Sequence, residues 1–158
     1  MFNWLSDRLG RFYAMLGEIT GIGATAHLFR ILGKTILADF GVAISRKGEF
    51  QIQGFPAGNF LIGVHIDLVI ITHAHLDHFG AIARLIRHHP KAKVIVARSA
   101  LMAIVFMLLD SLKIMEEERS KAKRLGIPQS EPLFTENDRL NFISNHNLVV
   151  IDLPCWLN

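Results

Sequence analysis

The chain has 158 residues, of which 51% are hydrophobic and 20% are charged. This length fits one domain or part of one, and the composition can form a core, which excludes a disordered chain. The net charge of +3 is too mild to indicate a partner, and the single cysteine, Cys155, excludes an intrachain disulfide and a cysteine-rich metal site.

The first 20 residues carry four charged side chains and lack the continuous apolar core of a signal peptide. Residues 1–10 are expected to be an extra N-terminal segment, and residues 11–16, "RFYAML", are expected to form a short strand. The most apolar run, residues 100–109, has 10 residues, whereas a membrane-spanning helix needs about 20. We therefore expect an intracellular protein without a membrane span, in which this run forms a buried helix.

The next segments read as strands joined by glycine-rich turns. Residues 17–26, "GEITGIGATA", form a glycine-rich loop, but no Lys-Ser/Thr follows the last glycine, as a P-loop would require. In residues 27–41, "HLFRILGKTILADFG", two apolar runs flank Gly33-Lys34, which predicts a hairpin. Residues 42–60 are rich in turn-forming residues.

The second half of the chain alternates strands with helices. Residues 66–72, "IDLVIIT", fit a strand that is covered on both faces. Helical spacing of apolar residues then runs from Phe79 to Ile86, with Pro90 ending the element. Residues 93–97 predict a strand, residues 99–125 one or two helices, and residues 147–154 a last strand. This order places the chain in the α/β or α+β class.

The stretch "VIITHAHLDHFGAI", residues 69–82, carries the chemistry. It places His73, His75, Asp77 and His78 within six positions where a buried strand ends. Residues two apart in an extended chain point the same way, so His73 and His75 can converge on one point. Asp77 and His78 follow where the chain turns into a helix, and they face a neighbouring point.

That spacing suits two adjacent metal ions. Imidazole and carboxylate ligands favour zinc, with iron or manganese also compatible. Two such metals can generate a nucleophile from water at neutral pH and neutralise charge during the displacement at a phosphodiester. Asp77 could instead protonate the leaving group or orient the nucleophile. The alternative reading is a histidine-rich loop that binds no metal.

A basic stretch follows the histidines. No acidic residue lies between Asp77 and Asp110, and such a stretch suits a phosphate-bearing partner such as RNA, although a solvated helix face would look the same. Its candidate RNA contacts are Arg84, Arg87, Lys91, Lys93 and Arg98.

Histidines outside the motif carry weaker signals. His88 and His89 are expected to complement the C-terminal end of a helix. His65 is treated as structural, and His146 as a residue of a surface loop.

These segments carry a resemblance to a known family. "THAHLDHFGAI" looks like the metal-binding motif of the metallo-β-lactamase superfamily. Residues 17–41 are similar to the opening of that superfamily, in which a strand ends in Asp-x-Gly, here Asp39-Phe40-Gly41. Residues 108–140 resemble the β-CASP branch, in which a helix of "DS…EEE" type leads to a "PL[YF]T-x-x-D" turn. That branch comprises RNA-processing nucleases, and the resemblance covers roughly residues 11–140.

The resemblance implies an αβ/βα sandwich and a zinc-dependent nuclease that acts on RNA. By position, His73 and His75 would bind the first of two zinc ions, and Asp77 and His78 would bind the second. Asp39 would support the site through a hydrogen bond from the neighbouring strand end.

The chain departs from the family after residue 140. Family members continue to a third histidine for the first zinc, a bridging aspartate, the inserted β-CASP domain and a further histidine, and no segment up to Asn158 looks like these. Residues 1–158 are therefore expected to be the N-terminal half of the sandwich, without a β-CASP domain, as a fragment or a shortened paralogue. Its sheet is expected to have an open edge and an uncovered face, which a second copy or a complementary partner could cover.

Two other functions remain open. One is a different metallo-β-lactamase-fold hydrolase that acts on a thioester, a phosphodiester or a lactone. The other is a non-catalytic chain that acts as a binding partner.

Overall fold

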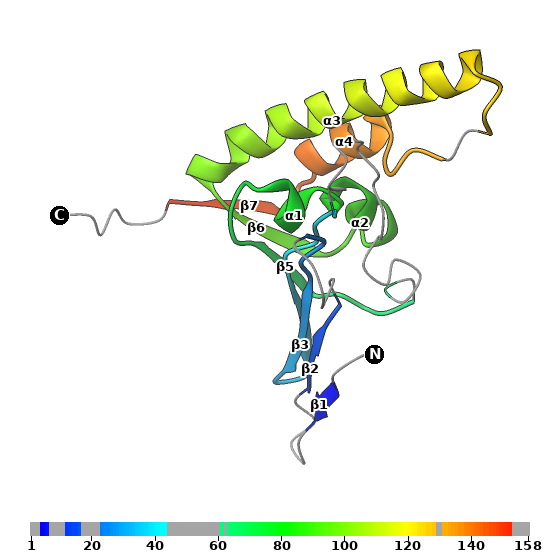
Figure 1. Cartoon of the computed structure of the whole chain (residues 1–158). Helices are drawn as coiled ribbons and strands as arrows, with labels where there is room; N and C mark the ends of the chain where they lie inside the picture. The colour runs from blue at the N-terminus through cyan, green and yellow to red at the C-terminus, as the bar shows by residue number, and fades with distance from the viewer. Residues whose placement is uncertain are drawn as a thin grey trace.

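The computed structural model describes residues 4–6, 12–16, 23–43, 61, 63–128 and 131–152 (Figure 1). Its strands form one sheet in which their order in space follows their order in the chain. They are β1 (Trp4–Ser6), β2 (Phe12–Met15), β3 (His27–Ile31), β4 (Lys34–Ala38), β5 (Leu68–Ile71), β6 (Lys93–Ala97) and β7 (Leu148–Ile151). Neighbouring strands from β1 to β4 pair antiparallel, and those from β4 to β7 pair parallel. The predicted strands are confirmed, and β1 is an addition.

The predicted hairpin is β3 and β4, with its turn one residue earlier than expected. Leu32 and Gly33 occupy the turn with φ of 53° and 74°, while Lys34 already begins β4. Two successive positive φ values are typical of the tight turn that matches the twist of paired strands. Leucine is unusual there, but its side chain is 94% exposed and therefore meets no packing constraint.

The helices are α1 (Leu76–Phe79), α2 (Ile82–His88), α3 (Arg98–Arg124) and α4 (Glu136–Ile143). The segment predicted as one or two helices is the single helix α3, after which Gly126 adopts a φ of 67°. α4 corrects the expectation of a turn in this segment. Thr135 and Asp138 form a capping box, each side chain accepting a backbone N–H of the other, and this begins the helix.

The core lies on one face of the sheet. Alternate residues of the parallel strands, such as Val69, Val94 and Val96, are fully buried, and they share a core cluster with side chains from α2, α3 and α4. α4 packs against both α2 and α3 (Figure 1). The expected α/β class is therefore confirmed, with helices against this face.

The opposite face of the sheet is apolar but only partly buried. Ile36, Ile70 and Ile95 point to it, and all three are half-buried and outside the core cluster. At the edge strand β7, Ile151 is 37% exposed.

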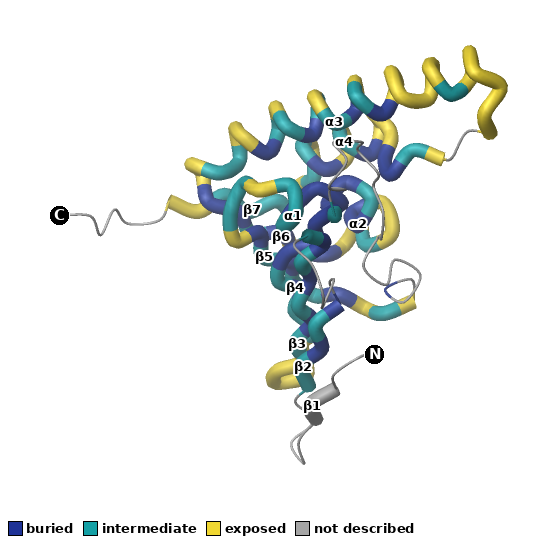
Figure 2. The backbone as a smooth tube through the Cα atoms, in the orientation of Figure 1, coloured by how far each residue is buried: buried dark blue, intermediate teal, exposed yellow. Residues whose placement is uncertain are grey.

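α3 is buried over only part of its surface. Ile104 and Leu108 are buried, but Met102 and Phe106 of the same apolar run are 61% and 63% exposed, so the expected buried helix is half-exposed. Beyond Met115 the helix has no buried residue (Figure 2). Among the described residues, no helix combines the length and apolarity needed to cross a membrane.

Candidate metal centre

The four motif residues gather at the carboxyl edge of the parallel strands. β5 ends at Ile71, the chain passes through residues 72–75, and α1 begins at Leu76. This edge is where open α/β sheets commonly place their sites. The ring centroids of His73 and His75 lie 4.5 Å apart, and those of His73 and His78 lie 4.0 Å apart. Asp77 Oδ2 lies 3.5 Å from His78 Nε2.

Asp39 anchors this cluster from the end of β4. Its carboxylate is 3% exposed and accepts hydrogen bonds from the Thr72 backbone N–H at 2.8 Å and from the Thr72 hydroxyl at 2.8 Å. It also lies 2.8 Å from His78 Nδ1. Asp39 itself has a φ of 62°, a conformation that aspartate and asparagine tolerate better than most residues. Hydrogen bonds from Asp39 therefore join the end of β4 to Thr72 and His78.

The hydrogen bonds orient two of the imidazoles. A carboxylate only accepts, so His78 donates Nδ1–H to Asp39, while its other ring nitrogen, Nε2, lies 3.5 Å from Asp77 Oδ2. The Thr72 hydroxyl donates its one hydrogen to Asp39, so it accepts from His73 Nδ1, 2.9 Å away. These tautomers follow from the hydrogen-bond network. In their neutral form both histidines would therefore present Nε2 as the electron-pair donor.

Thr72 was not among the sequence candidates. The one sequence feature that could have identified Thr72 is its position as a hydroxyl side chain between a buried strand and the first histidine.

Close backbone contacts hold the loop that carries the cluster. Thr25 N–H donates to Asp77 O at 2.8 Å, and Phe40 N–H donates to His78 O at 2.7 Å. A Cβ atom on Gly41 would lie 1.7 Å from Asp77 O, so only glycine permits this approach. The Asp39-Phe40-Gly41 segment therefore supplies both the buried carboxylate and the room for the loop.

The donor set suits a zinc-type metal by its chemistry. Three imidazoles and a carboxylate are gathered, and two of the imidazoles are oriented through Nδ1, as is usual for metal-binding histidines. Within the described ranges, however, no three His, Cys, Asp or Glu side chains converge closely enough to hold an ion. The residues therefore match a metal site in their chemical type, but the described side chains are not arranged to enclose an ion.

The structure disperses the predicted basic residues. Lys93 begins β6 and is paired in register with Leu68, the first residue of β5, so Lys91 and Lys93 lie at the amino edge of the sheet, opposite the histidines. Arg87, on α2, is bound to the buried Asp138 at 3.0 Å. Arg84 lies on α2 and is half-buried.

Arg98 lies at the same edge as the histidines. It directly follows β6, and Asp152 directly follows β7. The Arg98 guanidinium donates to both carboxylate oxygens of Asp152, at 2.6 Å and 3.3 Å. This hydrogen-bonded pair lowers the pKa of Asp152 and raises the pKa of Arg98.

The remaining histidines are not part of the cluster. Burial lowers the pKa values of His88 and His89, which disfavours the cation that was expected to complement the end of α2. His146 is exposed in the loop before β7, as predicted. His65 lies 3.5 Å from Asp67.

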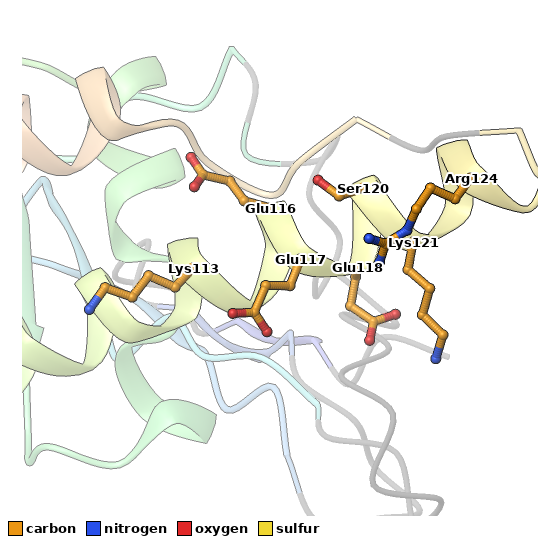
Figure 3. Close-up of a pocket in the computed structure, with 7 residues that line it drawn as sticks. All are labelled: Lys113, Glu116, Glu117, Glu118, Ser120, Lys121 and Arg124. Atoms are coloured by element: carbon orange, nitrogen blue, oxygen red, sulfur yellow. The ribbon is translucent and has the colours of Figure 1, made fainter.

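A shallow pocket elsewhere is a poor candidate for a site. It is lined by seven residues that all belong to α3, shown in Figure 3: Lys113, Glu116, Glu117, Glu118, Ser120, Lys121 and Arg124. A surface supplied by one exposed helix of mixed charge cannot enclose a small ligand.

Comparison with known proteins gives the following similarities. Residues 19–149 match the profile of the metallo-β-lactamase superfamily. Ribonuclease TTHA0252 of Thermus thermophilus is 32% identical over 100 residues, which are 63% of this chain and 22% of that protein. Endoribonuclease YSH1 of Candida glabrata is 22% identical over 145 residues, which are 90% of this chain and 18% of that protein. The chain thus spans about a fifth of the length of these two relatives.

A solved structure of a metallo-β-lactamase with a HARLDQ motif, from Cronobacter sakazakii, is 24% identical. It aligns with a TM-score of 0.39 over 61% of this chain and 32% of that one. The two ribonucleases among the relatives confirm the resemblance to RNA-processing nucleases.

Proposed function

Because the chain belongs to the metallo-β-lactamase superfamily, we propose that it is a metal-dependent ribonuclease of the β-CASP type, or the N-terminal part of one. The observation that carries the proposal is the hydrogen-bond network from Asp39 through Thr72 to His73 and from Asp39 to His78. A network that fixes imidazole tautomers is characteristic of metal sites.

The proposed ligands follow the motif. His73 and His75 would hold one zinc ion, and Asp77 and His78 a second. Zinc bound there supplies Lewis-acid activation of water and neutralisation of charge on a phosphodiester. The hydrogen bond to Asp39 fixes the ring of His78, whose Nε2 lies 3.5 Å from Asp77, and the Thr72 hydroxyl fixes the ring of His73 through Nδ1. Asp77 has a half-buried carboxylate that could instead accept or return a proton at the reacting oxygen.

The RNA-contacting role of the basic residues 84–98 belongs to the same proposal. Among them Arg98 is the one supported by its position, since it follows β6 at the edge that carries the histidines. An RNA substrate would be met inside the cell, so we also propose an intracellular location.

The test is cleavage of a labelled single-stranded RNA by the chain with added zinc. His75→Ala is expected to abolish zinc-dependent cleavage and to lower the zinc content measured after dialysis. His146→Ala is the matched control, because it removes an exposed imidazole outside the cluster. Cleavage by His75→Ala at the wild-type rate, with unchanged zinc content, would refute the assignment.

Two alternatives make different predictions in the same assay. A hydrolase for thioesters or lactones would turn over such a substrate and leave RNA intact. A non-catalytic chain would cleave neither and would need a partner, either a second copy or a complementary unit on the half-buried face of Ile36, Ile70 and Ile95.

A further inference from the structure

The pair formed by Arg98 and Asp152 stands at the proposed catalytic edge without an evident structural task. β5, β6 and β7 run parallel, with Ile71 level with Val96 and Ala97 level with Ile151. The chain continues from these ends into His73, Arg98 and Asp152 respectively. Neighbouring strands lie roughly 5 Å apart, so the backbone at Arg98 lies about one strand spacing from the end of β5, and its guanidinium reaches along the same edge to Asp152 at the end of β7.

The pair is open to solvent. The side chains of Arg98 and Asp152 are 66% and 71% exposed. Exposed ion pairs contribute little to stability because water and salt screen them. By contrast, Arg87 is held by Asp138, whose side chain is only 3% exposed. An anion from outside can therefore compete for Arg98 at small cost, but not for Arg87.

The geometry of the pair resembles phosphate recognition. Arg98 engages both carboxylate oxygens through Nε and one terminal nitrogen, and the same planar fork fits two oxygens of a phosphate. The first turn of α3, which Arg98 begins, contains no acidic residue and no side-chain cap. Asp152 is thus the acid that the structure places against this guanidinium.

We propose that Arg98 binds a phosphate of the RNA beside the metal centre, and that Asp152 holds the guanidinium in position until the phosphate displaces it. The proposal rests on the proposed function and adds the residue that places the backbone at the site. Asp152 acts as a competing anion, so its removal should strengthen RNA binding.

The test measures binding of a fluorescent single-stranded RNA by anisotropy, with the metal chelated so that no cleavage occurs. Arg98→Ala should weaken binding about 10-fold and lower the slope of log Kd against log salt by about one, as expected for one lost phosphate contact. Asp152→Asn should tighten binding several-fold. The double variant should bind like Arg98→Ala, because without the guanidinium there is nothing for Asp152 to occupy.

Lys113→Ala is the matched control, since it removes one exposed positive charge from the same helix, away from the edge. It should leave the affinity within about twofold of wild type, since a distant exposed charge is screened. Unfolding midpoints of all variants establish that each is folded. The proposal would be overturned if Arg98→Ala and Lys113→Ala weakened RNA binding equally. It would also be overturned if Asp152→Asn left the RNA affinity unchanged.

The outcomes separate this proposal from the nuclease assignment. If RNA binding depends on Arg98 but no zinc-dependent cleavage occurs, the phosphate site is supported and the nuclease proposal is refuted. If cleavage depends on His75 but neither cleavage nor binding changes in Arg98→Ala, the nuclease proposal is supported and the phosphate site is refuted. A wild-type chain that does not bind RNA in the chelated assay overturns the phosphate site, and the zinc-dependent cleavage assay decides the nuclease separately.

Discussion

At the scale of single residues, Asp39 performs two tasks that usually require different side chains. Its φ of 62° turns the chain at the end of β4, and its buried carboxylate accepts hydrogen bonds from Thr72 and His78. Asparagine tolerates the same backbone conformation, so Asp39→Asn removes the negative charge while keeping the turn at the end of β4. The variant keeps an acceptor for one partner, but it presents an amide N–H to the Nδ1–H of His78 or to the Thr72 hydroxyl.

We expect Asp39→Asn to reduce zinc affinity by about 10- to 100-fold, which is typical for loss of a partner behind a ligand. The measurement is a competition titration against a chromophoric chelator. Asp110→Asn, an exposed carboxylate on α3, is the control. Unchanged zinc affinity in a folded Asp39→Asn chain would show that the network does not serve metal binding.

At the scale of elements, regular patterns were predicted well and short ones were not. Strands β2 to β7 follow apolar runs, and α3 follows helical spacing up to Gly126. α4 was missed because it has only eight residues and its capping box uses Asp138 rather than a glutamate or glutamine. β1 was missed because it has only three residues, which is too short for an alternating apolar pattern to be recognised.

The placement of charges could not be predicted either. The run of basic residues in the sequence says nothing about strand ends, so Lys93 and Arg98 look equivalent there but lie at opposite edges of the sheet. Arg87 proved to join α2 to α4 through Asp138, a contact between residues 51 positions apart.

Arg87→Ala is therefore expected to lower the free energy of unfolding by about 1–3 kcal/mol, because it leaves a buried carboxylate short of one partner. Urea denaturation followed by circular dichroism provides the measurement. Lys113→Ala, which removes an exposed basic side chain, should leave the midpoint unchanged. A stable Arg87→Ala chain with weakened RNA binding would instead return Arg87 to the set of RNA contacts.

At the scale of the whole molecule, three distant segments meet around the site. Residues 23–25, 40–42 and 76–81 are joined by backbone hydrogen bonds, such as Gly41 N–H to Thr25 O at 3.0 Å and Ala81 N–H to Phe40 O at 3.0 Å. The motif itself was predicted from local spacing. The junction was not, because it depends on backbone contacts across the fold rather than on any pattern along the chain.

Gly41→Ala should lower the free energy of unfolding by about 3 kcal/mol or more, since a Cβ atom there meets the Asp77 backbone and one of the two segments must move. Gly33→Ala provides the comparison: it has open space around its Cβ but a φ of 74°, and should lose about 1–2 kcal/mol through strain alone. Urea denaturation measures both. A Gly41→Ala loss no larger than that of Gly33→Ala would contradict this account of the junction.

The contact between Asp39 and His78 also sets an order of events during folding. The two residues are 39 positions apart, and nothing local brings them together before β4 and β5 have paired. Closing a loop of this length costs entropy that only the later strand contacts repay. We therefore expect the Asp39–His78 contact, and with it the orientation of the His78 ring, to form late in folding. Any metal that needs this oriented donor set would therefore bind only after β4 and β5 have paired.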